Sequence, residues 1–126
     1  IKSTQDAKLN ETIDVKITSY LRDIEDYVSL HHPFRRNTYT IKDLAKGLQL
    51  PVSHLAYVFK YHCETSFVEF RNHHRIKDAL HLISINFLDA QTFEALAVKV
   101  GFNSYNSFFV SFKRYTGASP KDYLQH

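Results

Sequence analysis

The residues of this sequence that are best suited to chemistry lie on the outer face of a helix predicted from Ser104 to Thr116. Phe108, Phe112 and Tyr115, spaced by four and three residues, form the apolar face of that helix. The other face carries polar and aromatic groups near its start and cations near its end: Tyr105, Asn106, Phe109, Val110, Lys113 and Arg114. This distribution is expected of a helix whose first turns contact base edges of DNA and whose basic residues contact phosphates.

Tyr105 and Asn106 are the best candidates for direct base contact, and Phe109 and Val110 complete the predicted base-reading set. An asparagine can bond to both N6 and N7 of adenine, and a tyrosine can donate to base acceptors or pack against a thymine methyl group. The alternative is that Tyr105 and Asn106 cap or solvate the start of the helix.

The element that positions these residues is a helix-turn-helix from Thr92 to Thr116. Thr92 can cap a first helix whose apolar residues share one face: Phe93, Leu96, Ala97 and Val100. Gly101 ends that helix, because glycine adopts the left-handed conformation of a sharp turn without a Cβ penalty. The second helix then begins at Ser104.

The same pattern occurs earlier in the chain and makes an internal repeat. Leu44, Ala45, Leu48 and Leu50 correspond to Leu96, Ala97, Val100 and Phe102, and Leu55, Phe59 and Lys60 correspond to Phe108, Phe112 and Lys113. The offset is 52 residues in the first helices and 53 in the second. Ser66 lies seven residues after Phe59 and Ser119 seven residues after Phe112, and each serine can cap a further helix. We therefore expect two helix-turn-helix units.

In the first unit the residues predicted to read bases are Ser53, His54, Ala56 and Tyr57. They occupy positions similar to those of the second unit, and the small Ala56 would allow close approach. None of these side chains is a strong base reader, so a solvated helix face is an equal alternative.

Phosphate contacts are predicted from cations near helix ends and from hydroxyls near helix starts. The cations are Lys60, Lys113 and Arg114, and the hydroxyls belong to Thr40, Ser104 and Ser107. Arg75 could also reach a phosphate, but an arginine on the connecting helix could equally bridge the two lobes, and this structural role is favoured.

The second repeat resembles the signature segment of the AraC/XylS family of bacterial transcription regulators. The residues that carry the resemblance are Leu96, Val100, Gly101, Phe102, Ser107, Phe108, Phe112, Lys113, Gly117, Ser119, Pro120 and Tyr123. Arg75, four residues before Ala79, is similar to the arginine and alanine of the family's connecting helix, and the resemblance covers residues 39–123. It implies two helix-turn-helix units joined by a long helix, double-stranded DNA as a partner, and recruitment or positioning of RNA polymerase.

The sequence departs from the family pattern at Tyr57 and Val110, where an arginine often stands two residues before the Phe-Lys pair. Leu124 replaces a further arginine after the late tyrosine. These departures bear on DNA affinity and base preference more than on the fold.

Composition favours an all-α fold. Hydrophobic residues make up 44% of the 126 residues and charged residues 23%, while three glycines and three prolines leave few breaks for a β-sandwich. The net charge of +3 comes from residues 39–126, which hold ten Lys or Arg and seven Asp or Glu, whereas residues 1–38 hold six of each. A basic surplus in the part that carries the repeat is consistent with nucleic-acid binding, and it is equally consistent with an ordinary solvated surface.

The predicted organisation begins with a linker at 1–12 and an N-terminal helix with its connection at 13–38. The AraC-type domain follows at 39–126, with helix-turn-helix units at 39–66 and 89–126 and a connecting helix at 67–88. The N-terminal helix should run from Ile13 to Leu30 and pack on the first unit. The connecting helix should run from Phe67 to about Phe87, and twenty residues span about 30 Å, close to the roughly 34 Å of one DNA turn.

Catalysis and metal binding find little support in the residues. His73, His74 and His81 share one helix, but no cysteine or carboxylate set completes a tetrahedral site, so we expect no metal and no cofactor. Cys63 follows His62 without an identifiable base and orienting acid. The alternatives to a DNA-binding domain are an all-helical protein-interaction module and an enzyme that accepts a methyl group on Cys63.

The single cysteine and the lack of a signal peptide or a long apolar span predict a cytoplasmic protein. The sequence has no methionine and begins in a polar run, so we expect it to be a fragment. The missing N-terminal part would be a sensor or dimerisation region.

Overall fold

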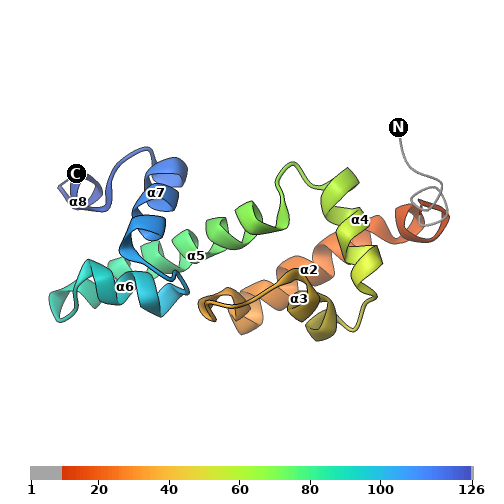
Figure 1. Cartoon of the computed structure of the whole chain (residues 1–126), viewed down its shortest axis with the longest axis horizontal. Helices are drawn as coiled ribbons and strands as arrows, with labels where there is room; N and C mark the ends of the chain where they lie inside the picture. The colour runs from red at the N-terminus through yellow and green to blue at the C-terminus, as the bar shows by residue number, and fades with distance from the viewer. Residues whose placement is uncertain (1–9, 126) are drawn as a thin grey trace. The chain divides into compact units, whose positions relative to one another are not determined.

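The structure, a computed structural model, describes residues 10–125 and divides them into two compact units (Figure 1). Unit 1 comprises residues 10–33 and 39–67, and unit 2 comprises residues 34–38 and 68–125. All regular elements in the described range are helices, which confirms the predicted all-α class. No helix in that range is long and apolar enough to cross a bilayer. Most of the linker predicted at 1–12 lies outside the described residues, and 10–12 are helical.

Unit 1 is built from the 3-10 helix η1 (Asp14–Lys16) and the helices α2 (Ile17–His31), α3 (Ile41–Leu48) and α4 (Val52–His62). Tyr20, Ile24 and Val28, four residues apart, form the buried stripe of α2, which packs against α3 as expected. The side chains buried on α3 and α4 are Leu44, Ala45, Leu55, Tyr57, Val58 and Phe59. The sequence therefore places α4 over an apolar core with one face turned outward.

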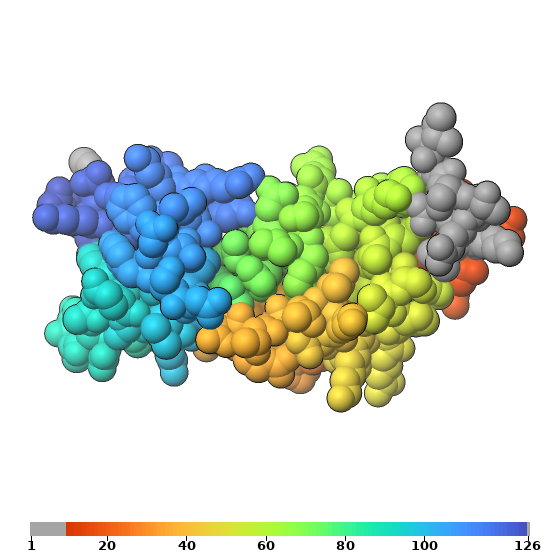
Figure 2. Space-filling model, viewed as in Figure 1, coloured from red at the N-terminus to blue at the C-terminus, as the bar shows by residue number. Residues whose placement is uncertain are grey.

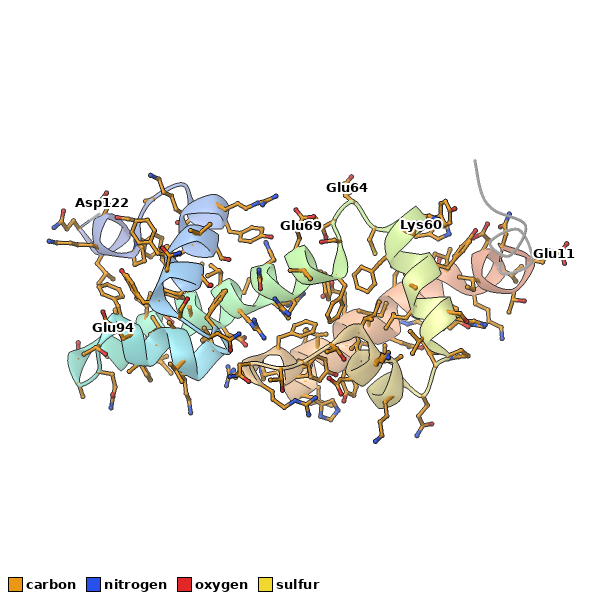
Figure 3. The ribbon with its side chains drawn as sticks, in the orientation of Figure 1. Glu11, Lys60, Glu64, Glu69, Glu94 and Asp122 are labelled. Atoms are coloured by element: carbon orange, nitrogen blue, oxygen red, sulfur yellow. The ribbon has the colours of Figure 1, made fainter. Side chains whose placement is uncertain are left out.

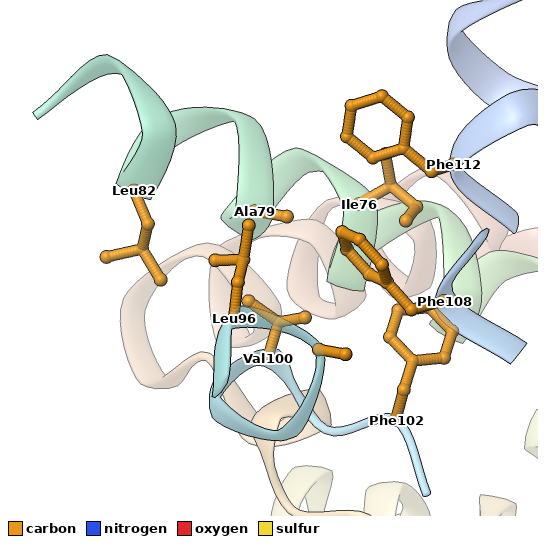
Figure 4. Close-up of a cluster of buried hydrophobic side chains, with 9 residues drawn as sticks. Ile76, Ala79, Leu82, Leu96, Val100, Phe102, Phe108 and Phe112 are labelled. Carbon is orange, nitrogen blue, oxygen red and sulfur yellow. The ribbon is translucent and has the colours of Figure 1, made fainter. Parts of the chain in front are cut away.

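Unit 2 contains most of α5 (Phe67–Ser84), followed by η3 (Phe87–Asp89), α6 (Phe93–Val100), α7 (Tyr105–Thr116) and α8 (Pro120–Leu124). Phe108 and Phe112 of α7 are fully buried, and each burial contributes about 2 kcal/mol. Figure 4 shows them among the residues of the core cluster, which are Ile76, Ala79, Leu82, Leu96, Ala97, Val100, Phe102, Phe108 and Phe112. The apolar face predicted for α7 is therefore its buried face.

Side-chain caps begin four of the helices, and the starts at Thr92, Ser104 and Ser119 were predicted from the sequence. Thr40 and Asp43 form a reciprocal capping box at α3, in which Thr40 Oγ1 accepts from the Asp43 amide at 3.3 Å. The Thr92 hydroxyl accepts from the Ala95 amide at 3.0 Å, and the Ser104 hydroxyl accepts from the Ser107 amide at 3.1 Å. Ser119 caps α8 in the same way, ahead of Pro120 at the first helical position. These caps fix where α3, α6, α7 and α8 start.

The two helix-turn-helix turns have the same hydrogen bonds at repeated positions. Gln49 ends α3 with φ of 59°, and Gly101, 52 residues later, ends α6 with φ of 114°. The next residue donates its amide to a carbonyl five residues back in both cases: Leu50 to Ala45 at 2.9 Å and Phe102 to Ala97 at 2.9 Å. The internal repeat in the sequence is therefore a repeat in backbone geometry.

Two helix ends differ from the predictions. The connecting helix was predicted to reach about Phe87 but ends at Ser84, because Asn86 adopts a left-handed conformation with φ of 71°. The amide of Ile85 donates to the carbonyls of both His81 and Leu82, which tightens the last turn. At the N-terminus, η1 interrupts the helix that was predicted to run unbroken from Ile13 to Leu30.

Gly101 is predicted to be more sensitive to substitution than Gly117, although both have positive φ. A Cβ on Gly101 would collide with the Phe34 carbonyl oxygen and lie 2.7 Å from Arg75 Nε, whereas a Cβ on Gly117 meets nothing within 4 Å. Gly117→Ala should cost about 1 kcal/mol of unfolding free energy from backbone strain, and Gly101→Ala at least about 3 kcal/mol. Urea denaturation followed by circular dichroism measures both, and equal losses would contradict the close approach.

Candidate nucleic-acid interface

The outer face of α7 presents the side chains predicted to read bases in the second unit. Asn106 is exposed, Tyr105 and Phe109 are half-buried, and Val110 keeps 58% of its surface exposed. Phe108 and Phe112 anchor the opposite side of the helix, which fixes the direction of this face. Residues of α7, coloured blue, lie at the surface in the view of Figure 2. The arrangement leaves an amide and a hydroxyl near the start of the helix, where base contacts are made.

Tyr105 is held by aromatic neighbours and keeps its proton. Its ring centroid lies 6.0 Å from that of Phe108 and 6.2 Å from that of Phe109. Burial, and then the carboxylate of Glu94, raise the pKa of the Tyr105 hydroxyl above its ordinary value. The hydroxyl is therefore a hydrogen-bond donor at neutral pH, suited to an acceptor on a base or a phosphate.

The outer face of α4 exposes fewer of the predicted base-reading side chains than the sequence predicted. Ser53 and Ala56 are exposed, and His54 is half-buried. The Nδ1 atom of His54 lies 3.1 Å from the hydroxyl of Tyr20 on α2. His54 is therefore positioned by a contact between residues 34 apart in the chain, which no local sequence signal could reveal.

Tyr57 was predicted to read bases, and this prediction is wrong. Its side chain is 2% exposed, and its hydroxyl donates to Asp14 Oδ1 of η1 at 3.2 Å. The same carboxylate oxygen lies 2.7 Å from Nε2 of His62. In the second unit the equivalent residue is Val110, which is 58% exposed. The N-terminal segment of unit 1 therefore covers a position that stays open on α7.

Arg75 was predicted to have either a phosphate contact or a structural role, which was favoured, and its burial excludes the phosphate contact. Its side chain is 3% exposed. The guanidinium donates to three backbone carbonyl oxygens of the segment 34–38: Phe34 at 2.7 Å, Arg36 at 3.1 Å and Asn37 at 3.3 Å. Burial, and then the charge of Arg71, lower the pKa of Arg75 to about 10, so the group stays protonated at neutral pH. Arg75 holds this segment in unit 2.

The remaining cations predicted to contact phosphates are exposed. Lys60 lies at the outer side of α4 (Figure 3), with Nζ 5.1 Å from the centroid of the Tyr61 ring. Lys113 is exposed near the end of α7. Arg114 is 64% exposed and donates to the Glu69 carboxylate at 2.7 Å, a surface ion pair of the kind that contributes under about 1 kcal/mol. An incoming phosphate could therefore replace Glu69 at small cost.

The hydroxyls predicted to contact phosphates lie in or beside the first turns of helices and remain at the surface, and those of Thr40 and Ser104 cap α3 and α7. Thr40 donates to Asp43 Oδ2 at 3.0 Å, and Ser104 donates to the Ser107 hydroxyl at 3.1 Å. Thr40, Ser104 and Ser107 are all exposed. They lie at helix N-termini, where free amides and the helix dipole favour an anion. Their contact with phosphate remains a prediction.

Cys63 and the histidines give no sign of a reactive centre in the part of the chain that the structure describes. Burial, and then the Glu25 carboxylate, raise the pKa of the half-buried Cys63 thiol, which keeps it protonated and weakly nucleophilic at neutral pH. His73, His74 and His81 join no group of three possible metal ligands within residues 10–125.

Comparison with known proteins identifies the family. The profile of a family described as "Helix-turn-helix domain" matches residues 44–126, and an uncharacterized response regulatory protein of Staphylococcus epidermidis is 30% identical over 104 residues. This chain belongs to the AraC/XylS family of helix-turn-helix transcription regulators. The AraC-type match begins at the α3 core and excludes η1 and α2. The segment that covers Tyr57 and contacts His54 therefore lies outside the matched residues.

Further relatives and solved structures agree with the AraC-type assignment. The transcriptional regulatory protein HptR of Staphylococcus aureus is 31% identical over 86 residues. The chain covers 39% of the Staphylococcus epidermidis protein and 32% of HptR, so it spans less than half of either relative. The C-terminal domain of AraT, a response regulator from Geobacillus stearothermophilus, superposes with a TM-score of 0.66, 23% identity and 82% coverage of both chains.

A DNA-binding transcriptional dual regulator from Escherichia coli K-12 superposes with a TM-score of 0.68 at 23% identity. That comparison covers 82% of this chain and 95% of the other. At this level of identity, both superpositions establish the shared fold.

Arg75→Lys is predicted to reduce stability and to leave DNA affinity unchanged. One ammonium group cannot satisfy the three carbonyls that the guanidinium binds, so the free energy of unfolding should fall by about 3 kcal/mol. Lys77→Ala, at an exposed position of α5, is the control and should change stability by less than about 0.5 kcal/mol. Urea denaturation and duplex titration measure the two quantities. A stable Arg75→Lys variant with weakened DNA binding would restore the phosphate role.

Proposed function

We propose that this chain is the DNA-binding domain of a bacterial transcription regulator and that α4 and α7 enter successive major-groove segments of duplex DNA. The observation that carries the proposal is the pair of helix-turn-helix units with matching turns at Gln49 and Gly101. Each unit leaves one face of its second helix exposed, with a cation near its end at Lys60 or Lys113. This is the arrangement that places side chains on base edges and charges on phosphates.

The base-reading residues of the proposal are those that remain on an outer face. On α7 they are Tyr105, Asn106, Phe109 and Val110, and on α4 they are Ser53, His54 and Ala56. The second unit offers the stronger readers, since Asn106 can bond to two adenine atoms and Tyr105 retains a proton to donate. We expect α7 to supply more of the base discrimination than α4.

The phosphate contacts of the proposal are the exposed cations Lys60, Lys113 and Arg114, with Thr40, Ser104 and Ser107 at helix starts. Arg75 and Tyr57 are excluded from the interface because each is buried.

The proposal extends to the longer protein. The relatives named response regulatory and transcriptional regulatory proteins are more than twice as long as the matched part. We propose that this domain works with a separate sensor or dimerisation region and that DNA binding positions RNA polymerase at a promoter. We also propose a cytoplasmic location, because a protein that binds chromosomal DNA must be in the same compartment.

Lys113→Ala is predicted to weaken binding to every duplex and to reduce the slope of log affinity against log salt by about 0.9, the value for one lost phosphate contact. Lys99→Ala is the matched control. Lys99 is also an exposed lysine, but it lies on α6 beside Phe87 and Val98 and is not one of the proposed phosphate contacts. Fluorescence anisotropy at several salt concentrations measures both slopes.

In the same titrations, a Lys113→Ala slope equal to that of Lys99→Ala would contradict the phosphate contact. No binding by the unmodified chain at low salt would contradict the proposed function and favour a protein-interaction module.

A further inference from the structure

The contact between Tyr20 and His54 joins the N-terminal helix α2 to the outer face of α4 within unit 1. The Tyr20 hydroxyl lies 3.1 Å from His54 Nδ1, and the two rings meet edge to face with centroids 6.2 Å apart. Tyr20 is buried, with 8% of its surface exposed, whereas His54 is half-buried beside the exposed Ser53. The Nδ1 atom of the His54 imidazole is thus held by the hydroxyl of the buried Tyr20.

The direction of this hydrogen bond follows from the needs of the buried hydroxyl. A buried O–H requires an acceptor, and among the described residues the hydroxyl of Tyr20 meets His54 Nδ1. If Nδ1 donated instead, the hydroxyl proton would be left without that acceptor. In the arrangement that gives the hydroxyl proton an acceptor, the hydroxyl donates and Nδ1 accepts, and the proton of a neutral imidazole is then on Nε2.

The fixed tautomer decides what His54 can offer to a ligand. Nε2 is the ring nitrogen farther from the backbone, and in this tautomer it is an N–H donor. In the major groove an N–H donor pairs with guanine O6 or N7, thymine O4 or adenine N7, and it conflicts with the amino group of cytosine N4. The opposite tautomer would present an acceptor and reverse this preference.

We propose that Tyr20 is a positioning residue that sets the base preference of α4, by holding His54 in the tautomer that donates from Nε2 to an acceptor on a base edge. The inference rests on the proposed function, because it requires α4 to lie in the major groove. Tyr20 lies outside the residues matched by the family profile. The base opposite His54 is one that presents an acceptor, with cytosine disfavoured.

The tautomer is tested without DNA by nitrogen-15 NMR of the histidine side chains in the 126-residue chain. The neutral imidazole of His54 in the unmodified chain should show a protonated Nε2 and an unprotonated Nδ1. Tyr20→Phe should give a mixture of both tautomers. Tyr27→Phe is the matched control, because it removes a hydroxyl from the same helix, where the Tyr27 ring contacts the ring of His31 in a tilted arrangement. A protonated Nδ1 in the unmodified chain would overturn the inference.

The base preference is tested by measuring affinity for a bound duplex in which each position is changed to the other three base pairs. Tyr20→Phe should reduce discrimination at one position by about fivefold, the effect of one hydrogen bond, and leave the other positions unchanged. His54→Ala should flatten the same position, and the double variant should show no further change. Tyr27→Phe should keep the full profile.

The outcomes separate this inference from the proposed function. If the unmodified chain binds no duplex, the proposed function fails, and the inference fails with it. If the unmodified chain binds but Tyr20→Phe keeps its base profile, the inference alone fails. If Tyr20→Phe weakens every duplex equally, Tyr20 merely packs against α4, and the inference is again overturned.

Discussion

The close approach of backbone and guanidinium at the end of α6 is the constraint on which unit 2 depends. Gly101 has no side chain, so the Phe34 carbonyl oxygen can lie against it, and that oxygen accepts a hydrogen bond of 2.7 Å from Arg75. Arg75 in turn stands over the Phe102 ring at 5.4 Å. The turn that orients α7 and the segment 34–38 are therefore secured by one buried charge with three carbonyl partners. A side chain at Gly101 would disturb both.

The two helix-turn-helix units share their turn geometry but differ in what covers the second helix. In unit 1, Asp14 of η1 accepts from the hydroxyl of Tyr57, and Tyr20 of α2 contacts His54. At the position of Tyr57, α7 carries Val110, which is exposed. These contacts from the N-terminal elements leave fewer of the predicted base-reading side chains on the outer face of α4 than on that of α7. We expect the two helices to contribute unequally to base recognition.

The sequence predicted the parts of this structure that local chemistry controls. The caps at Thr92 and Ser119 and the turn at Gly101 follow from side chains and backbone preferences within a few residues. The base-reading role of Tyr57 and the phosphate role of Arg75 were wrong, and the partners of these side chains lie 43 and about 40 residues away in the chain. Helical spacing could not reveal that η1 covers Tyr57 or that segment 34–38 surrounds Arg75.

We propose that one chain reads DNA with both α4 and α7. Hydroxyl-radical footprinting combined with methylation interference, on a duplex selected from a random library, tests this claim most directly. If both helices bind, two protected major-groove segments should appear, with centres about one helical turn, roughly 10 base pairs, apart on one face of the duplex. A single protected segment would show that one helix binds and would contradict the claim.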